Sequence, residues 1–380
     1  MPGEHAKLSA SSAHRWLACT ASPTLEAQFP DTASPYAAEG TLAHTWAEKA
    51  AHARIFAPDN FFDAGNCEGE MLDAALAYAD LVVARYRDAL TRDRAPTVYL
   101  EERVDFATWV PEGFGTADCL IIADGTLEVI DFKYGKGVKV AAADNPQMQL
   151  YALGAFYTHD CDVLYDIHTV RMTIFQPRLS DTPDVAEMPI DELRRWAANV
   201  LRPKAREAFD GPGQFVPGEK QCRFCRAAAQ CRARANEVLS LFDEVERGDL
   251  LSDAEVGNLL QRAQIFKAWL DSTADYVEKS LLRGNLVPGW KMVAGRSTRK
   301  IADTAAAGKA LTDAGFPEST VFRRELETLT NLEKLVGKKR LPELLGELIQ
   351  KPEGKPTLVP ESDKRPALQP NGQMLDAFDE

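Results

Sequence analysis

An Asp-Gly pair at positions 124 and 125 stands between two runs of β-forming residues, 116–123 and 126–132. Such a pair between such runs is typical of a two-residue β-hairpin turn. The turn also fixes which residues face each other, because Ala123 must then pair with Thr126. The sequence therefore predicts a hairpin whose register can be counted outward from the turn.

Counting outward places Asp118 opposite Asp131, and alternation of side chains puts Lys133 on the same face. Opposed like charges destabilise a hairpin, so the two carboxylates need a counter-charge. A hard divalent cation, Mg²⁺ or Mn²⁺, would supply it. Lys133 could then polarise a phosphate or help orient and deprotonate a water. A surface carboxylate pair with Lys133 as its salt-bridge partner explains the local pattern equally well.

Helical and extended periodicities alternate along the first half of the chain. The pattern predicts, in order, two helices, three strands, a helix and a strand region, over 35–56, 71–92, 99–106, 116–123, 126–132, 145–157 and 163–175. This order indicates an α/β (α+β) fold with a mixed sheet flanked by helices.

The second half of the chain has mainly helical patterns, over 190–209, 226–247 and, after a capping box that opens at Ser252, to about 283. Residues 286–345 are expected to form a smaller helical or α+β unit. From Lys351 onward the chain has five prolines and few large apolar side chains, which indicates a disordered tail. We therefore expect a domain over 1–240, a C-terminal helical extension over 241–345 and a tail over 346–380.

The 380 residues are 45% hydrophobic, enough for one large domain or two. No apolar run approaches the roughly 20 residues that span a bilayer, and the first residues have no signal-peptide pattern. We expect a soluble, cytoplasmic protein without a membrane partner. The net charge of −13 argues against general nucleic-acid binding. However, residues 220–234 carry five positive charges and no negative one, and Lys133, Lys136 and Lys139 form a second basic patch. Each patch suits a polyanion or a solvated face about equally.

Four motifs now carry a resemblance: Glu39-Gly-Thr-Leu-Ala-His44, Gly115-Thr-Ala-Asp118, Glu128-Val-Ile-Asp131-Phe-Lys133 and Gln147-Met-Gln-Leu-Tyr151. Together, in this order, they resemble the motifs of the RecB-like branch of the PD-(D/E)XK nucleases. The predicted element order is similar to the αβββαβ core of that restriction-endonuclease-like fold.

The resemblance implies a role for each matching residue. His44, Asp118 and Asp131 would bind a metal together with the backbone carbonyl of Phe132, and Lys133 would be the catalytic lysine. Three further residues would contact DNA or support the site, namely Gln147, Tyr151 and Glu101. The residues alone leave simpler alternatives: His44 could be a hydrogen-bonded structural histidine, and Gln147 and Tyr151 could only pack along one helix face.

Seven cysteines, an odd number, in a chain without an export signal argue against a disulfide framework. Cys222, Cys225 and Cys231 lie within ten residues and supply three soft ligands, so one more is required. Zinc and an iron–sulfur cluster both suit such a site. The remaining cysteines, Cys67, Cys119 and Cys161, are expected to be small buried residues.

A subset of the RecB-like family, including AddB-type subunits and CRISPR-adaptation nucleases, has one cysteine before the nuclease motifs and three after them. Cys19 and the later trio match this arrangement, which implies a [4Fe–4S] cluster. Zinc is the alternative, with His14 able to replace Cys19. Arg223 and Arg226 would border a DNA channel.

The whole chain is also similar to a phage and prophage family of this nuclease class, which carries segments like Pro288-Gly-Trp-Lys291 and Gly295-Arg-Ser-Thr-Arg299. The resemblance implies an exonuclease that acts on DNA ends or single strands in phage recombination or replication, in the bacterial host cytoplasm if phage-encoded. A non-catalytic DNA-binding or assembly subunit is the alternative, and an iron–sulfur redox protein is a weaker one. No Walker A pattern is present, so an ATP-driven helicase is not expected.

Overall fold

The computed structural model describes residues 6–30, 35–57, 62–123, 125–240, 252–291, 304–314, 318, 337 and 340–345. The chain divides into two compact units, Met1–Asn285 and Leu286–Glu380. In the second unit the described residues form the helices α12 (Thr304–Asp313) and α15 (Arg340–Leu345). The expected three-part division stays a prediction, because the tail over 346–380 lies outside the described residues, as does the segment 295–299.

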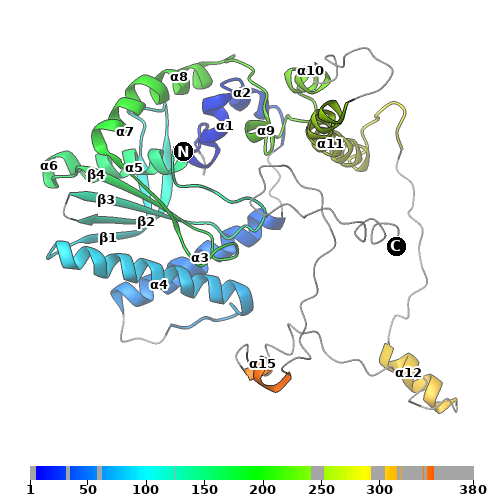
Figure 1. Cartoon of the computed structure of the whole chain (residues 1–380), viewed down its shortest axis with the longest axis horizontal. Helices are drawn as coiled ribbons and strands as arrows, with labels where there is room; N and C mark the ends of the chain where they lie inside the picture. Colours follow the sequence, from blue (N-terminus) through cyan, green and yellow to red (C-terminus); the bar gives the residue numbers. More distant parts are fainter. Residues whose placement is uncertain are drawn as a thin grey trace. The chain divides into compact units, whose positions relative to one another are not determined.

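A five-stranded mixed sheet forms the centre of the first unit (Figure 1). Its strands follow the chain order: β1 (Thr97–Asp105), β2 (Phe114–Ala123), β3 (Thr126–Phe132), β4 (Thr169–Phe175) and β5 (Asp184–Pro189). Strands β3 and β4 are parallel, and the other neighbours are antiparallel. The predicted mixed sheet flanked by helices is confirmed, and β5 adds an edge strand that the sequence analysis did not include.

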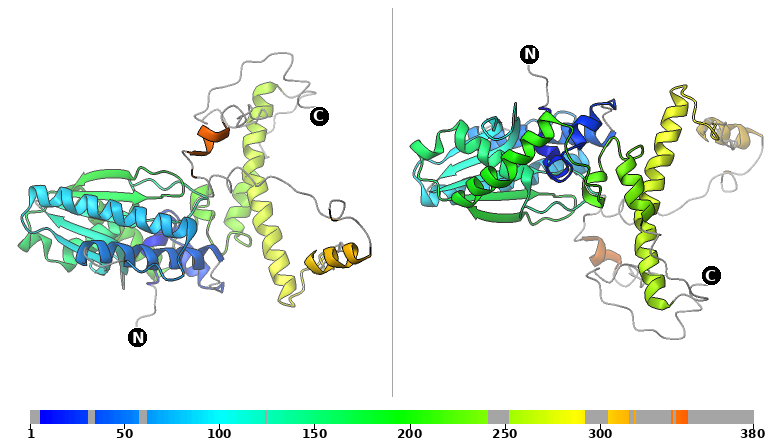
Figure 2. Two further views of the ribbon diagram at one scale, coloured as in Figure 1. Left: turned by 90° about the horizontal axis from the view of Figure 1, so that it is seen from below. Right: turned by 90° about the horizontal axis from the view of Figure 1, so that it is seen from above.

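Helices cover both faces of the sheet (Figures 1 and 2). One face packs against α3 (Pro35–Phe56) and α4 (Gly69–Arg92). The opposite face packs against α5 (Pro146–Thr158) and against a continuous helical stretch made of α7 (Ile190–Trp196), the π-helical turn η2 (Ala197–Leu201) and α8 (Arg202–Asp210). A short N-terminal 3₁₀ helix, η1 (Ala10–Ser12), and α1 (Ala13–Ala18) add Ala10, Ala13 and Trp16 to this second core.

The hairpin between β2 and β3 has the predicted register. Ala123 pairs with Thr126, and Leu120 pairs with Val129. Gly125 has a φ of +73°, a left-handed conformation that suits glycine at such a turn. Asp124, the other predicted turn residue, lies outside the described residues.

The crossover from β3 to β4 runs through α5, because parallel strands need a long connection. Asn145 caps this helix: its side chain accepts hydrogen bonds from the N–H groups of Gln147 and Met148. Gly154 lets the helix approach β1 closely, since a Cβ there would meet the Val104 side chain at 2.9 Å. The cap and the close packing fix where Gln147 points.

The predicted strand region over 163–175 is wrong at its start. Residues Cys161–Leu164 form the short helix α6, and β4 begins only at Thr169. The N–H groups of Val163 and Leu164 donate to the Asp160 carbonyl, and both side chains are exposed. Their apolar character therefore reflects surface residues and not a buried strand.

The later part of the first unit is helical. It contains α9 (Glu219–Cys222), α10 (Arg232–Ser240) and α11 (Asp253–Leu282). The capping box predicted at Ser252 is present, with Glu255 as its partner. The helix predicted from 226 begins only at Arg232, because the residues before it form turns. No helix in the described part of the chain is long and apolar enough to cross a membrane.

Candidate functional site

Three carboxylates form a row across three neighbouring strands. Leu100 pairs with Cys119 and Glu102 with Ala117, so Glu101 of β1 lies opposite Asp118 of β2. The β2–β3 ladder ends at the pair Cys119–Ile130, one position before Asp118 and Asp131, and there the Asp118 side chain accepts a hydrogen bond from the Phe132 N–H. The direct opposition of the two aspartates stays a prediction, whereas the β1–β2 register places Glu101 opposite Asp118.

His44 reaches this row from α3. Its Nδ1 lies 3.2 Å from an Asp118 oxygen, and the other Asp118 oxygen accepts a hydrogen bond of 2.6 Å from the Phe132 N–H. Burial alone would lower the pKa of His44, but the hydrogen bond and the charge of Asp118 raise it above its usual range. His44 and Asp118 are thus in direct contact, and Phe132 contacts Asp118 through its N–H; the expected role of the Phe132 carbonyl as a metal ligand stays a prediction.

Glu101 completes a group of three potential metal ligands. One ligand atom each from His44, Glu101 and Asp118 lies within 4.8 Å of the others. Glu101 has a φ of +49°, which is uncommon for a residue other than glycine. Burial, and next the charge of Asp118, raise the pKa of Glu101 to about 7. Glu101 was expected only to support the site, whereas the geometry makes it an equal candidate ligand.

Asp131, Lys133 and Gln147 form a connected polar network. Lys133 Nζ lies 2.9 Å from Asp131 Oδ2 and donates at 3.1 Å to Oδ1 and at 3.0 Å to the Gln147 carbonyl. Gln147 Nε2 donates at 3.1 Å to Asp131 and at 3.3 Å to the Tyr151 hydroxyl. Gln147 and Tyr151 therefore do more than pack, and Gln149 is buried without a contact to this network.

Burial and the neighbouring charges act in opposite directions on Asp131 and Lys133. Burial raises the pKa of Asp131 although Lys133 opposes the change. Burial would lower the pKa of Lys133, but the charges of Asp131 and Asp118 raise it, so the lysine stays a cation. The Asp131 side chain is only 3% exposed, and Lys133 Nζ lies 2.9 Å from its Oδ2 and 3.1 Å from its Oδ1, so the lysine supplies the nearest counter-charge to both oxygens.

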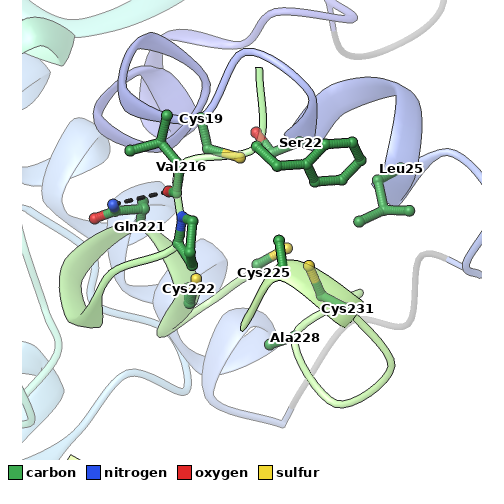
Figure 3. Close-up of a pocket in the computed structure, with 12 residues that line it drawn as sticks. Cys19, Ser22, Leu25, Val216, Gln221, Cys222, Cys225, Ala228 and Cys231 are labelled. Carbon is green, nitrogen blue, oxygen red and sulfur yellow. Dashed lines mark hydrogen bonds between the residues drawn. The ribbon is translucent and has the colours of Figure 1, made fainter. Parts of the chain in front are cut away.

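The four predicted cluster cysteines line one pocket. Cys19, which follows α1, lies together with Cys222, Cys225 and Cys231 around a single opening (Figure 3). The lining is otherwise mainly apolar and includes Leu25, Val216 and Ala228. The structure thus brings together residues that are about 200 positions apart in the chain, as predicted. His14, the alternative fourth ligand, is not part of this lining.

The spacing of the sulfurs bears on which cofactor fits. A tetrahedral zinc with bonds of about 2.3 Å holds its sulfurs about 3.8 Å apart. Among the described residues, which include every cysteine, no three cysteine sulfurs lie within 4.8 Å of one another. In every trio of these sulfurs, at least one pair is therefore farther apart than the sulfurs of a bound tetrahedral zinc.

The cysteine segment is attached to the N-terminal helices by Glu26, the last residue of α2 (Ser22–Glu26). The buried Glu26 carboxylate lies 2.9 Å from Arg15 Nε and accepts a hydrogen bond of 2.9 Å from the Arg226 N–H. Arg15 also donates to the Phe224 carbonyl at 2.8 Å. Burial, followed by the charge of Glu26, raises the pKa of Cys225 to about 12, so this thiol is neutral without a cofactor.

The predicted DNA-contacting arginines have different surroundings. Arg223 lies over the Phe224 ring at 5.6 Å. Arg226 is bound to Glu26 through its backbone and, at 4.0 Å, through its side chain. Sequence reasoning missed Glu26 and also Arg178, which lies next to the loop after β3. No local sequence signal marks either residue, since their contacts join distant segments.

The sequence matches the family described as "Protein of unknown function (DUF2800)" over residues 5–366. The solved structure titled "Crystal structure of SSO0001" is similar over 50% of this chain and 85% of that chain, at 12% identity and a TM-score of 0.18. At that TM-score the match defines no shared fold. The family match extends over most of the chain, and the protein therefore belongs to the DUF2800 family.

Proposed function

We propose that this protein is a metal-dependent DNA nuclease of the RecB-like PD-(D/E)XK class. The observation that carries the proposal is the contact of His44 with Asp118 directly beside the network of Asp131, Lys133 and Gln147. A buried cation, two neighbouring carboxylates and a histidine in one place suit charge stabilisation better than a structural ion pair.

The donor set fits a divalent metal. His44, Glu101 and Asp118 offer nitrogen and oxygen ligands within 4.8 Å, and the carboxylate of Asp131 is close enough for the charge of Asp118 to act on it. These residues, with the Phe132 carbonyl, would hold Mg²⁺ or Mn²⁺. When bound, such an ion lowers the pKa of a water and acts as a Lewis acid on a phosphate.

The protein's own residues would prepare the phosphodiester for hydrolysis. Lys133 is a fixed cation, held by Asp131 and Gln147, and would stabilise the negative charge that grows on the scissile phosphate. Gln147 is hydrogen-bonded to both Lys133 and Asp131 and so fixes their relative positions, and it also donates a hydrogen bond to the Tyr151 hydroxyl. The leaving 3′ oxygen would take a proton from solvent or from a neighbouring acid.

We propose a [4Fe–4S] cluster as the second cofactor, held by Cys19, Cys222, Cys225 and Cys231, with zinc as the alternative. Its support is the single pocket that all four cysteines line (Figure 3). The Ser22 hydroxyl, which also lines the pocket, is buried and makes no hydrogen bond, so it could donate to a cluster sulfur. The cluster would join the N-terminal helices to the segment after α8.

The expected substrates are single-stranded DNA or DNA ends, in phage recombination or replication and in a cytoplasmic setting. The test is cleavage of 5′- and 3′-labelled single- and double-stranded DNA by anaerobically purified protein with Mg²⁺, Mn²⁺ or Ca²⁺. Cleavage with Mg²⁺ or Mn²⁺ supports the proposal. DNA binding without cleavage under all three ions would instead support a non-catalytic binding or assembly subunit.

A further inference from the structure

The loop that follows Lys133 is a compact basic surface beside the candidate site. Residues 135–139, Gly-Lys-Gly-Val-Lys, are all exposed and contain no acidic residue. Lys133 is the site residue closest to this loop in the sequence, and it lies three positions before Lys136. A strand that reached Lys133 would therefore pass close to the loop.

The backbone of this loop has donors to offer. Within the described part of the chain, the N–H groups of residues 135–139 donate to no protein acceptor. A Cβ built at Gly135 or Gly137 would meet nothing within 4 Å, so a ligand could approach the backbone there. Successive free N–H groups next to lysines are a typical setting for binding phosphate.

Two side chains from the segment after β4 hold the loop in place. The amide of Gln176, a buried residue, donates to the Val138 carbonyl at 3.0 Å and accepts from the Val140 N–H at 2.7 Å. Arg178 donates to the Tyr134 carbonyl at 3.3 Å and lies over the Tyr134 ring. The loop is thus anchored on both sides while its central residues stay exposed, which lowers the ordering cost of binding.

Glu70, at the start of α4, partly neutralises this surface. Its carboxylate lies 2.8 Å from Lys136 Nζ and 3.0 Å from Arg178 Nη2. The Glu70 and Lys136 side chains are both 53% exposed. Because water surrounds the ion pair, it contributes little to the stability of the fold. A phosphate could replace the carboxylate as the partner of Lys136 without a large penalty.

We propose that residues 135–139 bind the sugar-phosphate backbone of the nucleic-acid strand, close to the bond that is cut. Lys136 and Lys139 supply the charge, the exposed N–H groups supply hydrogen bonds, and Glu70 competes with the phosphate for Lys136. This inference rests on the proposed nuclease function and extends it to the path of the strand. Contacts of this type fix position without reading sequence.

The test measures affinity for a labelled single-stranded oligonucleotide of mixed sequence, with full-length protein in buffer free of divalent cations. The double variant K136A/K139A should bind more weakly, and its slope of log affinity against log salt should be shallower by about 1.4, since each lost phosphate contact removes about 0.7. The matched control K267A/K279A removes two exposed lysines of α11 and should keep the wild-type slope.

Glu70→Gln separates this role from a structural ion pair. If Lys136 only stabilised the loop through Glu70, E70Q would weaken binding as K136A does. If Lys136 binds phosphate, E70Q should strengthen binding, because a competing negative charge is gone. Wild-type cleavage of DNA together with an unchanged slope in K136A/K139A would overturn the loop assignment alone. A wild-type protein that neither binds nor cleaves DNA would overturn the proposed function and this inference with it.

Discussion

Glu26 is expected to be one of the most sensitive positions for stability, although it lies outside the candidate catalytic site. Its side chain is 7% exposed and joins Arg15 of α1 to the backbone of Arg226, 200 residues later. Glu26→Ala removes the carboxylate and leaves the Arg15 guanidinium, which is 14% exposed, without its nearest counter-charge. The Arg226 N–H also loses its acceptor.

The size of the effect follows from this burial. Breaking a buried ion pair by removing one partner costs about 3–5 kcal/mol. With an m-value of about 3 kcal/mol/M in urea, the unfolding midpoint should fall by more than about 1 M. The same change should loosen the segment that carries Cys225, so E26A should also retain less iron.

The matched control is Glu187→Ala. Glu187 also pairs with an arginine, Arg171, at 2.6 Å, but its side chain is 50% exposed. Exposed pairs contribute about 0–1 kcal/mol, so E187A should shift the urea midpoint by less than about 0.3 M. Urea titrations followed by tryptophan fluorescence compare the two variants directly. If E26A unfolds at the same midpoint as E187A, Glu26 does not hold the two segments together.

Three further predictions concern the cofactors and the polar network. Cys225→Ser should lose bound iron and its visible absorbance, whereas Cys161→Ser, a buried cysteine outside the pocket, should keep both; equal iron in the two variants would contradict the cluster assignment. Burial, followed by the charge of Asp118, raises the pKa of Glu101 from 4.5 to about 7. Between pH 4.5 and pH 7 the Glu101 carboxyl is therefore protonated in the metal-free folded state and ionised in the unfolded state. The unfolding free energy of the protein should therefore fall as the pH rises from 4.5 to 7, and Glu101→Gln should lack this part of the pH dependence in urea titrations. Gln147→Leu should lower kcat about 10–100-fold with little change in the melting temperature, because it removes the residue that positions Lys133; an unchanged kcat would argue against that role.

The hairpin and its aspartates could be predicted because the signal is local. A two-residue turn fixes the register, from which Asp118 is expected to face Asp131, and the observed pairs follow that register as far as Cys119 and Ile130. The Leu120–Val129 pair has the counted register, and both side chains are buried on the same face. The spacing from Gln147 to Tyr151 likewise predicted a shared helix face, which the hydrogen bond between them confirms.

Other parts of the site could not be predicted because they depend on distant contacts. Glu101 faces Asp118 only through the β1–β2 register, and the connection over 106–113 is not a two-residue turn that would fix it. Glu26 and Arg178 each act on segments far away in the chain, and an isolated charged residue carries no signal of its burial. In α6 a local signal was instead misleading: the apolar residues Val163 and Leu164 suggested a strand, but they are exposed residues of a short helix.

The most direct test of the account is single-turnover cleavage of end-labelled DNA with Mn²⁺, by the wild type and by Lys133→Ala prepared in parallel. Lys133 contacts Asp131 and Gln147 but is not itself a ligand, so K133A should still bind DNA and Mn²⁺. The account predicts efficient cleavage by the wild type and a rate lower by about 10²–10³-fold in K133A. Equal cleavage rates in the two proteins would contradict the assignment of the active site, and no cleavage by the wild type would contradict the proposed activity.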